Sequence, residues 1–278
     1  MFTGRKLLIA TKHQKEMTIA PILEKELAVK CYTSDVFDTD LLGTFSGELQ
    51  RKDDALTTLR NKCIGASIAN NCDLILASEG SFGAHPSIFF ANANVELVML
   101  KDFKNDIEIV AREISMETNF NGKTITSEYE LLAFAEQIQF PSHGIILRPA
   151  EKVYTKMHKG IVTHELLLQH YRELKAEFVS VYAETDMRAL FNPTRMKVIE
   201  KATQNLIEKI KHLCPNCSTP GFDIVTAQAG LPCENCSLPT RSTLSYLYQC
   251  KKCNHTENKL YPRGIQFEDP TYCDNCNP

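Results

Sequence analysis

The sequence ends in four cysteine motifs, Cys214-Pro-Asn-Cys217, Cys233-Glu-Asn-Cys236, Cys250-Lys-Lys-Cys253 and Cys273-Asp-Asn-Cys276. A Cys-x-x-Cys turn directs two thiolates at one ion, and two such turns complete the tetrahedral sulfur set that Zn²⁺ accepts. The intervals between motifs are 15, 13 and 19 residues, each suitable for a ribbon hairpin. The motifs therefore predict two structural zinc ions in a double zinc ribbon over residues 214–278.

The order in which these motifs pair admits two arrangements. Consecutive pairing, which we favour from the spacing, joins Cys214/Cys217 with Cys233/Cys236 and the third motif with the fourth. A crossed arrangement, in which the first motif pairs with the third and the second with the fourth, stays open. Four thiolates leave no open coordination position, so either arrangement predicts zinc that stabilises structure and does not activate water.

The net charge of this tail indicates which class of partner it can bind. Residues 214–278 contain five Lys or Arg and six Asp or Glu, and eight thiolates around two Zn²⁺ add four more negative charges. A surface that binds phosphate backbones needs the opposite sign. The whole chain, with 278 residues and a net charge of −3, has no basic excess either. We expect a structural or protein-binding module, and a nucleic-acid-binding ribbon is the less favoured alternative.

The remaining cysteines and the N-terminus favour a cytoplasmic protein. Cys31, Cys63 and Cys72 are isolated, as small core residues are, and paired cysteines in a reducing compartment usually ligate metal. The apolar run at residues 7–10 is shorter than the core of a signal peptide, and no later run approaches a membrane span. We therefore expect no membrane partner.

Hydrophobic periodicity predicts an α/β domain over residues 1–191, with a mixed sheet flanked by helices. Asn192-Pro193 begins a long helix, because Asn suits the cap and Pro the first helical position. We expect residues 192–213 to form this connecting helix, packed on the α/β domain, before the ribbon module at 214–278. Strands are expected at 6–11, 72–78, 95–100, 107–113, 144–147 and 178–182, and helices near 16–28, from 53 or 54, at 127–137 and at 163–176.

Four polar segments follow strands or helices, at residues 11–16, 43–48, 78–81 and 184–188. Ligands of open α/β sheets bind beyond the carboxyl ends of the strands. Thr11, Lys12 and Lys15 lie between a strand and a helix N-terminus, which suits a phosphate group. The same segment reads equally well as an exposed polar turn.

Acidic residues at these segments suggest a metal-assisted site. Glu79, between Ser78 and Gly80 at a strand end, is placed to bind Mg²⁺ beside a substrate phosphate, with an exposed turn as the alternative. Glu48 is a further candidate in the second segment. Lys62, on the preceding helix, suits either phosphate or solvent.

Three residues in or near the long helix complete the candidates. Asp186 and Arg188 are placed to form a local ion pair or to face the same cleft. Arg195 lies in the first turn of the helix, where a cation opposes the helix dipole. That placement is easier to understand if Arg195 contacts an anion or a carboxylate.

Two family resemblances rest on these motifs. Phe-Asp-Thr-Asp (37–40), Gly-Thr-Phe-Ser-Gly-Glu (43–48), Ser-Glu-Gly-Ser-Phe-Gly (78–83), Glu-Thr-Asp-Met-Arg-Ala (184–189), Asn-Pro-Thr-Arg-Met (192–196) and the double ribbon together resemble an uncharacterised, mainly bacterial family. That resemblance spans the chain and implies no function. The segments 10–15, 59–62 and 78–81, with the hairpin at 95–113, distantly resemble the inosine/xanthosine triphosphate pyrophosphatase superfamily.

The second resemblance, together with the polar segments, leads to a Mg²⁺-dependent hydrolase of nucleotides or other phosphorylated small molecules. Glu79, together with Glu48 or Asp186, would hold the metal, and Lys15, Lys62, Arg188 and Arg195 would neutralise phosphate charge. The alternative is a non-catalytic protein that binds a small anion and recruits a protein partner through its zinc module.

Overall fold

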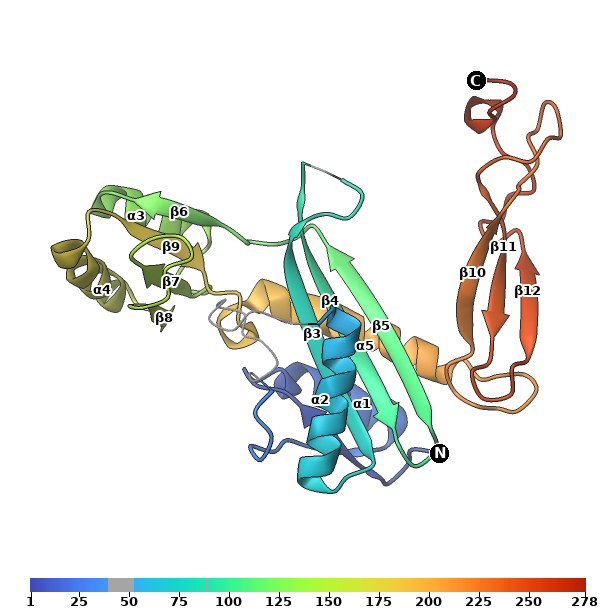
Figure 1. Cartoon of the computed structure of the whole chain (residues 1–278), viewed down its shortest axis with the longest axis horizontal. Helices are drawn as coiled ribbons and strands as arrows, with labels where there is room; N and C mark the ends of the chain where they lie inside the picture. The colour runs from blue at the N-terminus through green and yellow to red at the C-terminus, as the bar shows by residue number, and fades with distance from the viewer. Residues whose placement is uncertain (40–52, 89) are drawn as a thin grey trace. The chain divides into compact units, whose positions relative to one another are not determined.

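The computed structural model describes residues 1–39, 53–88 and 90–278. The chain forms two compact units, Met1–Ile207 and Glu208–Pro278, which we describe separately (Figure 1). The first unit contains two sheets and all of the candidate anion-binding residues that the structure describes. The second contains the eight paired cysteines.

A five-stranded mixed sheet begins the first unit, with strand order β2-β1-β3-β4-β5. Strand β1 runs parallel to both β2 and β3, whereas β3, β4 and β5 form an antiparallel meander. This confirms the predicted mixed α/β architecture. The strands are β1 (Lys6–Ala10), β2 (Lys30–Tyr32), β3 (Leu74–Ala84), β4 (Asn92–Asp102) and β5 (Ile107–Ser115).

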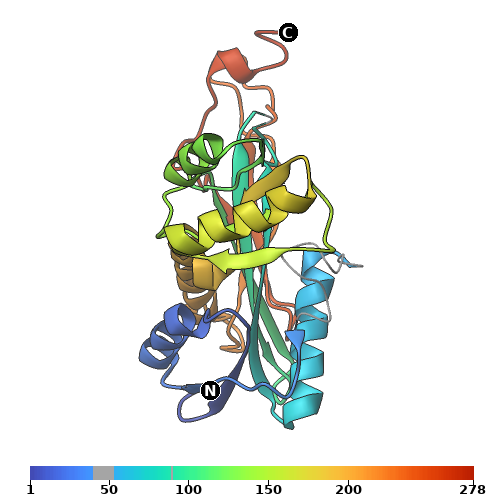
Figure 2. The same cartoon turned by 90° about the vertical axis from the view of Figure 1, so that its left-hand side faces the viewer.

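Helices α1 (Glu16–Leu27) and α2 (Ala55–Asn70) lie on opposite sides of this sheet, as Figure 2 shows with α1 in blue and α2 in cyan. Asp54 caps helix α2, because its carboxylate accepts hydrogen bonds from the N–H groups of Leu56 and Thr57. The apolar side of α2 packs on the first, third and fourth strands. This core contains Leu8, Ala10, Leu59, Cys63, Ala66, Ile75, Ala77 and Met99.

Strand β3 differs from the prediction. We expected a strand over residues 72–78 followed by a polar segment, with an exposed turn as one interpretation of Glu79, but β3 continues to Ala84 and pairs with β4 along its whole length. The long antiparallel hairpin satisfies the backbone groups that a turn would have left exposed. Strand β1 ends at Ala10, opposite Ala77, so residues 78–84 of β3 extend past the end of β1.

A second, antiparallel sheet has the order β6-β9-β7-β8. Helices α3 (Glu128–Gln137) and α4 (His164–Glu177) pack on it around a separate core that includes Leu131, Leu147 and Leu167. Its strands are β6 (Gly122–Ile125), β7 (Ile145–Arg148), β8 (His158–Ile161) and β9 (Val181–Thr185). The sequence did not indicate β2, β6 or β8, because strands of three or four residues carry almost no periodic signal.

The long helix α5 (Pro193–Lys211) follows a short 3₁₀ turn, η2 (Ala189–Phe191). Asn192 caps α5, since its side-chain oxygen accepts a hydrogen bond from the backbone N–H of Arg195 at 2.9 Å. The apolar stripe of α5 is buried, and Asn205 donates to Glu113 of β5 at 2.9 Å. Leu213, expected as the last residue of the connecting helix, lies beyond the end of α5 and is half exposed.

The second unit is built on one antiparallel sheet of order β10-β11-β12, with strands β10 (Asp223–Ala229), β11 (Thr243–Gln249) and β12 (Thr256–Leu260). A 3₁₀ turn, η3 (Pro270–Tyr272), precedes the last cysteine motif. Its buried cluster is small and consists of Cys214, Phe222 and Cys250, with Tyr248 packed against them. So small a core makes metal ligation the natural source of stability.

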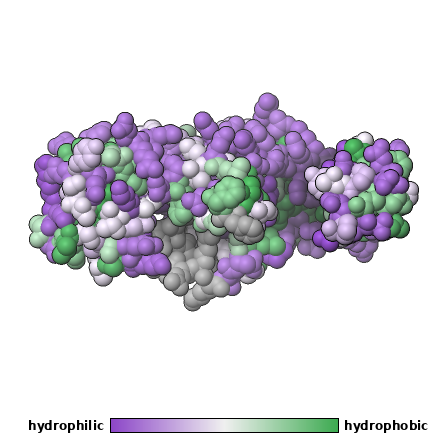
Figure 3. Space-filling view, turned by 90° about the horizontal axis from the view of Figure 1, so that it is seen from above, coloured by the Kyte–Doolittle hydropathy of each residue, from purple (hydrophilic) through white to green (hydrophobic). Residues whose placement is uncertain are grey.

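On the face drawn in Figure 3, the described residues show hydrophilic side chains interspersed with small hydrophobic groups. Among the described residues, no helix combines the length and apolar character needed to cross a membrane.

Candidate functional site

The eight cysteines form two clusters that could each hold one zinc ion. Their members are Cys214, Cys217, Cys250 and Cys253 in the first, and Cys233, Cys236, Cys273 and Cys276 in the second. In the first cluster, Sγ–Sγ distances are 3.7 Å for Cys214–Cys253 and 3.6 Å for Cys217–Cys250. A tetrahedral ion with Zn–S bonds of about 2.3 Å requires about 3.8 Å between sulfurs. The donor set and its spacing therefore fit structural zinc.

The pairing is crossed, so the favoured consecutive arrangement is wrong. The three-stranded meander explains why: β10 carries the chain from the first motif to the far end of the sheet, and β11 brings it back. Residues Asp223, Gln249 and Thr256 pair at one end, beside the first and third motifs. A seven-residue strand spans roughly 24 Å, so consecutive motifs lie at opposite ends and cannot share an ion.

A signal in the sequence could have revealed this pairing. Residues 214–220 and 233–239 both read Cys-x-Asn-Cys-Ser-x-Pro. Asn216 and Asn235 donate side-chain hydrogen bonds to Cys253 and Cys276, at 3.6 and 3.5 Å. The first and second motifs thus have the same role in two equivalent sites, which means that they belong to different sites.

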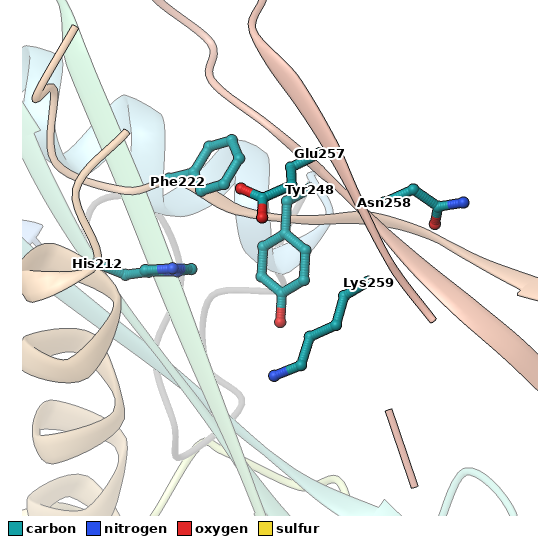
Figure 4. Close-up of a pocket in the computed structure, with 6 residues that line it drawn as sticks. All are labelled: His212, Phe222, Tyr248, Glu257, Asn258 and Lys259. Carbon is teal, nitrogen blue, oxygen red and sulfur yellow. The ribbon is translucent and has the colours of Figure 1, made fainter. Parts of the chain in front are cut away.

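A pocket of about 440 Å³ lies beside the first cysteine cluster (Figure 4). The rings of His212 and Tyr248 meet edge to face at 5.5 Å, and Phe222 packs against both. Glu257, Asn258 and Lys259 complete the lining. The pocket combines aromatic surface with one acidic and one basic side chain.

In the first unit, Lys15 is buried at the N-cap of α1, at the end of the segment that joins β1 to this helix. Its ammonium donates to the hydroxyl of Ser78 on β3 at 3.0 Å. Burial lowers the pKa of Lys15 to about 7, with a further contribution from the positive charge of Arg195. The predicted Lys15 and Ser78 are therefore in contact, although 63 residues separate them.

Lys62 and Glu79 form a buried ion pair between α2 and β3. Both side chains are less than a tenth exposed, so the readings of Lys62 as a solvated charge and of Glu79 as part of an exposed turn are wrong. Register places Glu79 on the face that α2 covers, together with Ala77 and Leu97. Ser78 and Gly80 point to the opposite face.

Arg195 binds Glu96, a residue that the sequence analysis missed. Arg195 Nε donates to Glu96 Oε1 at 2.7 Å and Nη1 donates to the carbonyl of Met187 at 2.6 Å, and both charged side chains are fully buried. Gly80 makes room for this pair, since a β-carbon there would overlap the Glu96 carboxylate and lie 2.6 Å from Arg195 Nη2. A charged residue inside the apolar strand at 95–100 was the available signal.

Together these residues form a buried charged cluster, which we define as Lys15, Lys62, Glu79, Glu96 and Arg195. Each of the other four influences the pKa of Lys15 electrostatically. Lys62 and Glu79 lie on the α2 face of the sheet and the other three on the opposite face. The two groups lie close together because β3 extends past the end of β1 there.

The remaining candidates that the structure describes, Thr11, Lys12, Asp186 and Arg188, form other contacts. Asp186 is buried and pairs with Arg188 at 2.6 Å, and it also accepts a hydrogen bond from the backbone N–H of Gly160. Lys12 pairs with Asp38 at 2.6 Å near the surface, and the Thr11 hydroxyl donates to the carbonyl of Lys12. Glu48 falls outside the described residues.

A larger pocket, of about 800 Å³, opens at the opposite end of the first sheet. Arg5, Tyr32, Asp73 and Lys104 help to line it, and Arg5 forms an ion pair with Asp73 at 3.1 Å. It contains none of the predicted residues. Because it lies at the amino ends of β1 and β3, it is the less favoured end for a ligand of an α/β sheet.

Comparison with known proteins gives a family without an assigned activity. A family model described as "Domain of unknown function (DUF6671)" matches residues 62–278, which include all eight paired cysteines and most of the charged cluster. No curated protein matches the chain. These comparisons give no support for the likeness to inosine/xanthosine triphosphate pyrophosphatases. Because the family model matches more than half of the chain, the chain belongs to the DUF6671 family.

Proposed function

We propose that the first unit binds a phosphorylated small molecule, with nucleotides as the first candidates, where β3 extends past the end of β1. The observation that carries this proposal is the buried ammonium of Lys15 at the N-terminus of α1. Burial of a lysine is costly, and the helix dipole opposes a cation at this end of the helix. An anion at the same place reverses both penalties.

The charged cluster supports an anion as ligand. Arg195 and Lys62 add positive potential at Lys15, and both lower its pKa. The N-terminus of α1 contributes partial positive charge, and its N-cap residue, Lys15, makes no side-chain capping hydrogen bond to the helix. A phosphate group held there would restore the protonated form of Lys15, so binding and proton uptake are coupled.

Hydrolysis with Mg²⁺ is the second candidate, and Glu79 is the residue that favours it. Glu79 lies on the extended part of β3, next to Gly80 and within the cluster. In the arrangement described, however, its carboxylate holds Lys62, and Asp186 holds Arg188. Magnesium would have to displace one of these cations, so we place anion binding before catalysis.

The cysteine clusters have a supporting role in this proposal. Two zinc ions with four thiolates each would order the second unit, and its aromatic pocket offers a surface for a protein partner. The net negative charge of the tail disfavours nucleic acid as that partner.

Calorimetric titration with a nucleoside triphosphate, a nucleoside monophosphate and inorganic phosphate, with and without Mg²⁺, tests the proposal. We expect binding that weakens above pH 7 by up to about tenfold per pH unit, because Lys15 must take up a proton. Lys15→Met should lose at least tenfold in affinity. Lys25→Met, on the exposed side of the same helix, is the matched control and should bind normally.

A phosphate-release assay on the same samples separates the two candidates. Turnover that requires Mg²⁺ and disappears in Glu79→Gln would establish the hydrolase. Binding without turnover supports the non-catalytic alternative. Failure of all these ligands to bind, or equal binding by Lys15→Met, would refute the anion site.

A further inference from the structure

His158, His170 and Glu173 converge on one point in the second sheet of the first unit. His158 begins β8, whereas His170 and Glu173 lie on α4, which packs against that sheet. Positions three residues apart face the same side of a helix, so α4 presents both side chains toward the strand. One ligand atom from each of the three residues lies within 4.8 Å of the other two.

The distances match those of a small metal site. Glu173 Oε2 is 3.0 Å from His170 Nδ1 and 3.7 Å from His158 Nε2. Tetrahedral zinc with bonds of 2.0–2.2 Å requires about 3.3 Å between nitrogen and oxygen ligands. The two measured separations bracket this value, so shifts of a few tenths of an ångström would complete the site.

One ring nitrogen of His158 has no hydrogen-bond partner among the described residues. Its Nε2 atom is buried and makes no hydrogen bond to any described residue, and its ring stacks on that of His170 with centroids 3.9 Å apart. A buried polar nitrogen without a partner costs free energy, and two stacked imidazoles cannot both be protonated without repulsion. A divalent cation between the rings and the carboxylate removes both problems.

Neighbouring side chains favour an orientation in which the Glu173 carboxylate faces the two histidines. Gln169 donates to Glu173 Oε1 at 2.9 Å, which leaves Oε2 directed at the two histidines. Such hydrogen bonds to ligands are the usual outer support of metal sites. The nearby cation Lys156 forms an ion pair with Glu177 at 2.5 Å.

We propose that His158, His170 and Glu173 bind Zn²⁺, or a divalent transition-metal cation of similar preference, as a third site apart from both cysteine clusters. Two imidazoles and one carboxylate suit such cations and leave the fourth position for water or another ligand. The three side chains are 22–41 % exposed, so solvent reaches the site. This site does not depend on the proposed anion site.

The test is calorimetric titration of the full chain with Zn²⁺, after the cysteine clusters have been filled and loose metal removed. We expect one further equivalent to bind to the wild-type protein. His158→Asn and His170→Asn should abolish it, and Glu173→Gln, the variant closest in shape, should weaken it by at least about tenfold, because removing a ligand costs at least as much as removing an outer-shell partner. His164→Gln is the control, because His164 is on α4 but packs on Phe140.

Titration with Cu²⁺ followed by electron paramagnetic resonance gives a second readout. Coupling to two imidazole nitrogens is expected in the wild-type protein, and loss of that two-nitrogen signal in either histidine variant. Circular dichroism and an unchanged content of cysteine-bound zinc establish that the variants are folded. The proposal is overturned if no third equivalent binds, or if folded Glu173→Gln and both histidine variants bind it as the wild type does.

Discussion

Crossed pairing of the cysteine motifs predicts different zinc contents for two double variants, and consecutive pairing predicts the opposite assignment of these contents to the two variants. Cys217→Ser/Cys250→Ser removes two sulfurs that lie 3.6 Å apart in one cluster. The second cluster keeps its four cysteines, with Cys236 and Cys273 also 3.6 Å apart. This variant should therefore keep one zinc ion per chain, whereas consecutive pairing would leave none.

The complementary variant is Cys217→Ser/Cys236→Ser, which removes one sulfur from each cluster. It should lose both ions, whereas under consecutive pairing it would lose only one. Structural zinc in small ribbons binds with roughly 10–16 kcal/mol, and three remaining thiolates do not supply that affinity. The expected difference between the variants is thus one full equivalent, well above the error of the measurement.

Elemental analysis of protein dialysed against a mild chelator, with native mass spectrometry as a second method, measures these contents. Wild-type protein should carry two zinc ions, and Cys31→Ser, outside both clusters, should match it. One ion in Cys217→Ser/Cys236→Ser together with none in Cys217→Ser/Cys250→Ser would refute the crossed pairing. Loss of both ions from both variants would show that the two sites fill only together.

Three further predictions concern the first unit. Gly80→Ala should lower the free energy of unfolding, measured by urea denaturation, by about 3–5 kcal/mol, because the added methyl group displaces the buried Glu96–Arg195 pair. A loss below about 1 kcal/mol would contradict that packing. The pKa of Lys15 is about 7 when folded and near 10.5 when unfolded, so the unfolded chain binds more protons between these values and stability rises with pH there, by up to about 1.4 kcal/mol per unit. Urea unfolding at several pH values should show a flatter profile in Lys15→Met, and identical profiles would exclude this titration. Asp54→Ala should cost about 1 kcal/mol in thermal unfolding, since it removes the cap of α2, and an unchanged midpoint would count against that cap.

The geometry of the candidate anion site was only partly predictable from the sequence. Lys15, Ser78 and Glu79 were found because polar residues after apolar strands are visible along the chain. Their burial was not visible, since it depends on how far β3 extends beside β4. Glu96 was not predicted as a site residue, because no neighbour in the sequence explains a single charge inside an apolar strand. Its partner, Arg195, is 99 residues away.

The sequence by itself determined what local chemistry dictates. Cys-x-x-Cys spacing sets the ligand type, Asn192-Pro193 sets the start of α5, and alternating apolar runs set the mixed α/β class. The tertiary structure alone decided which motifs share an ion, which charges pair, and that His158 meets His170 and Glu173. The physical reason is that each strand carries the chain about 24 Å along the sheet, so the direction of the strand decides which motifs lie at the same end. That direction is fixed by contacts between residues distant in sequence.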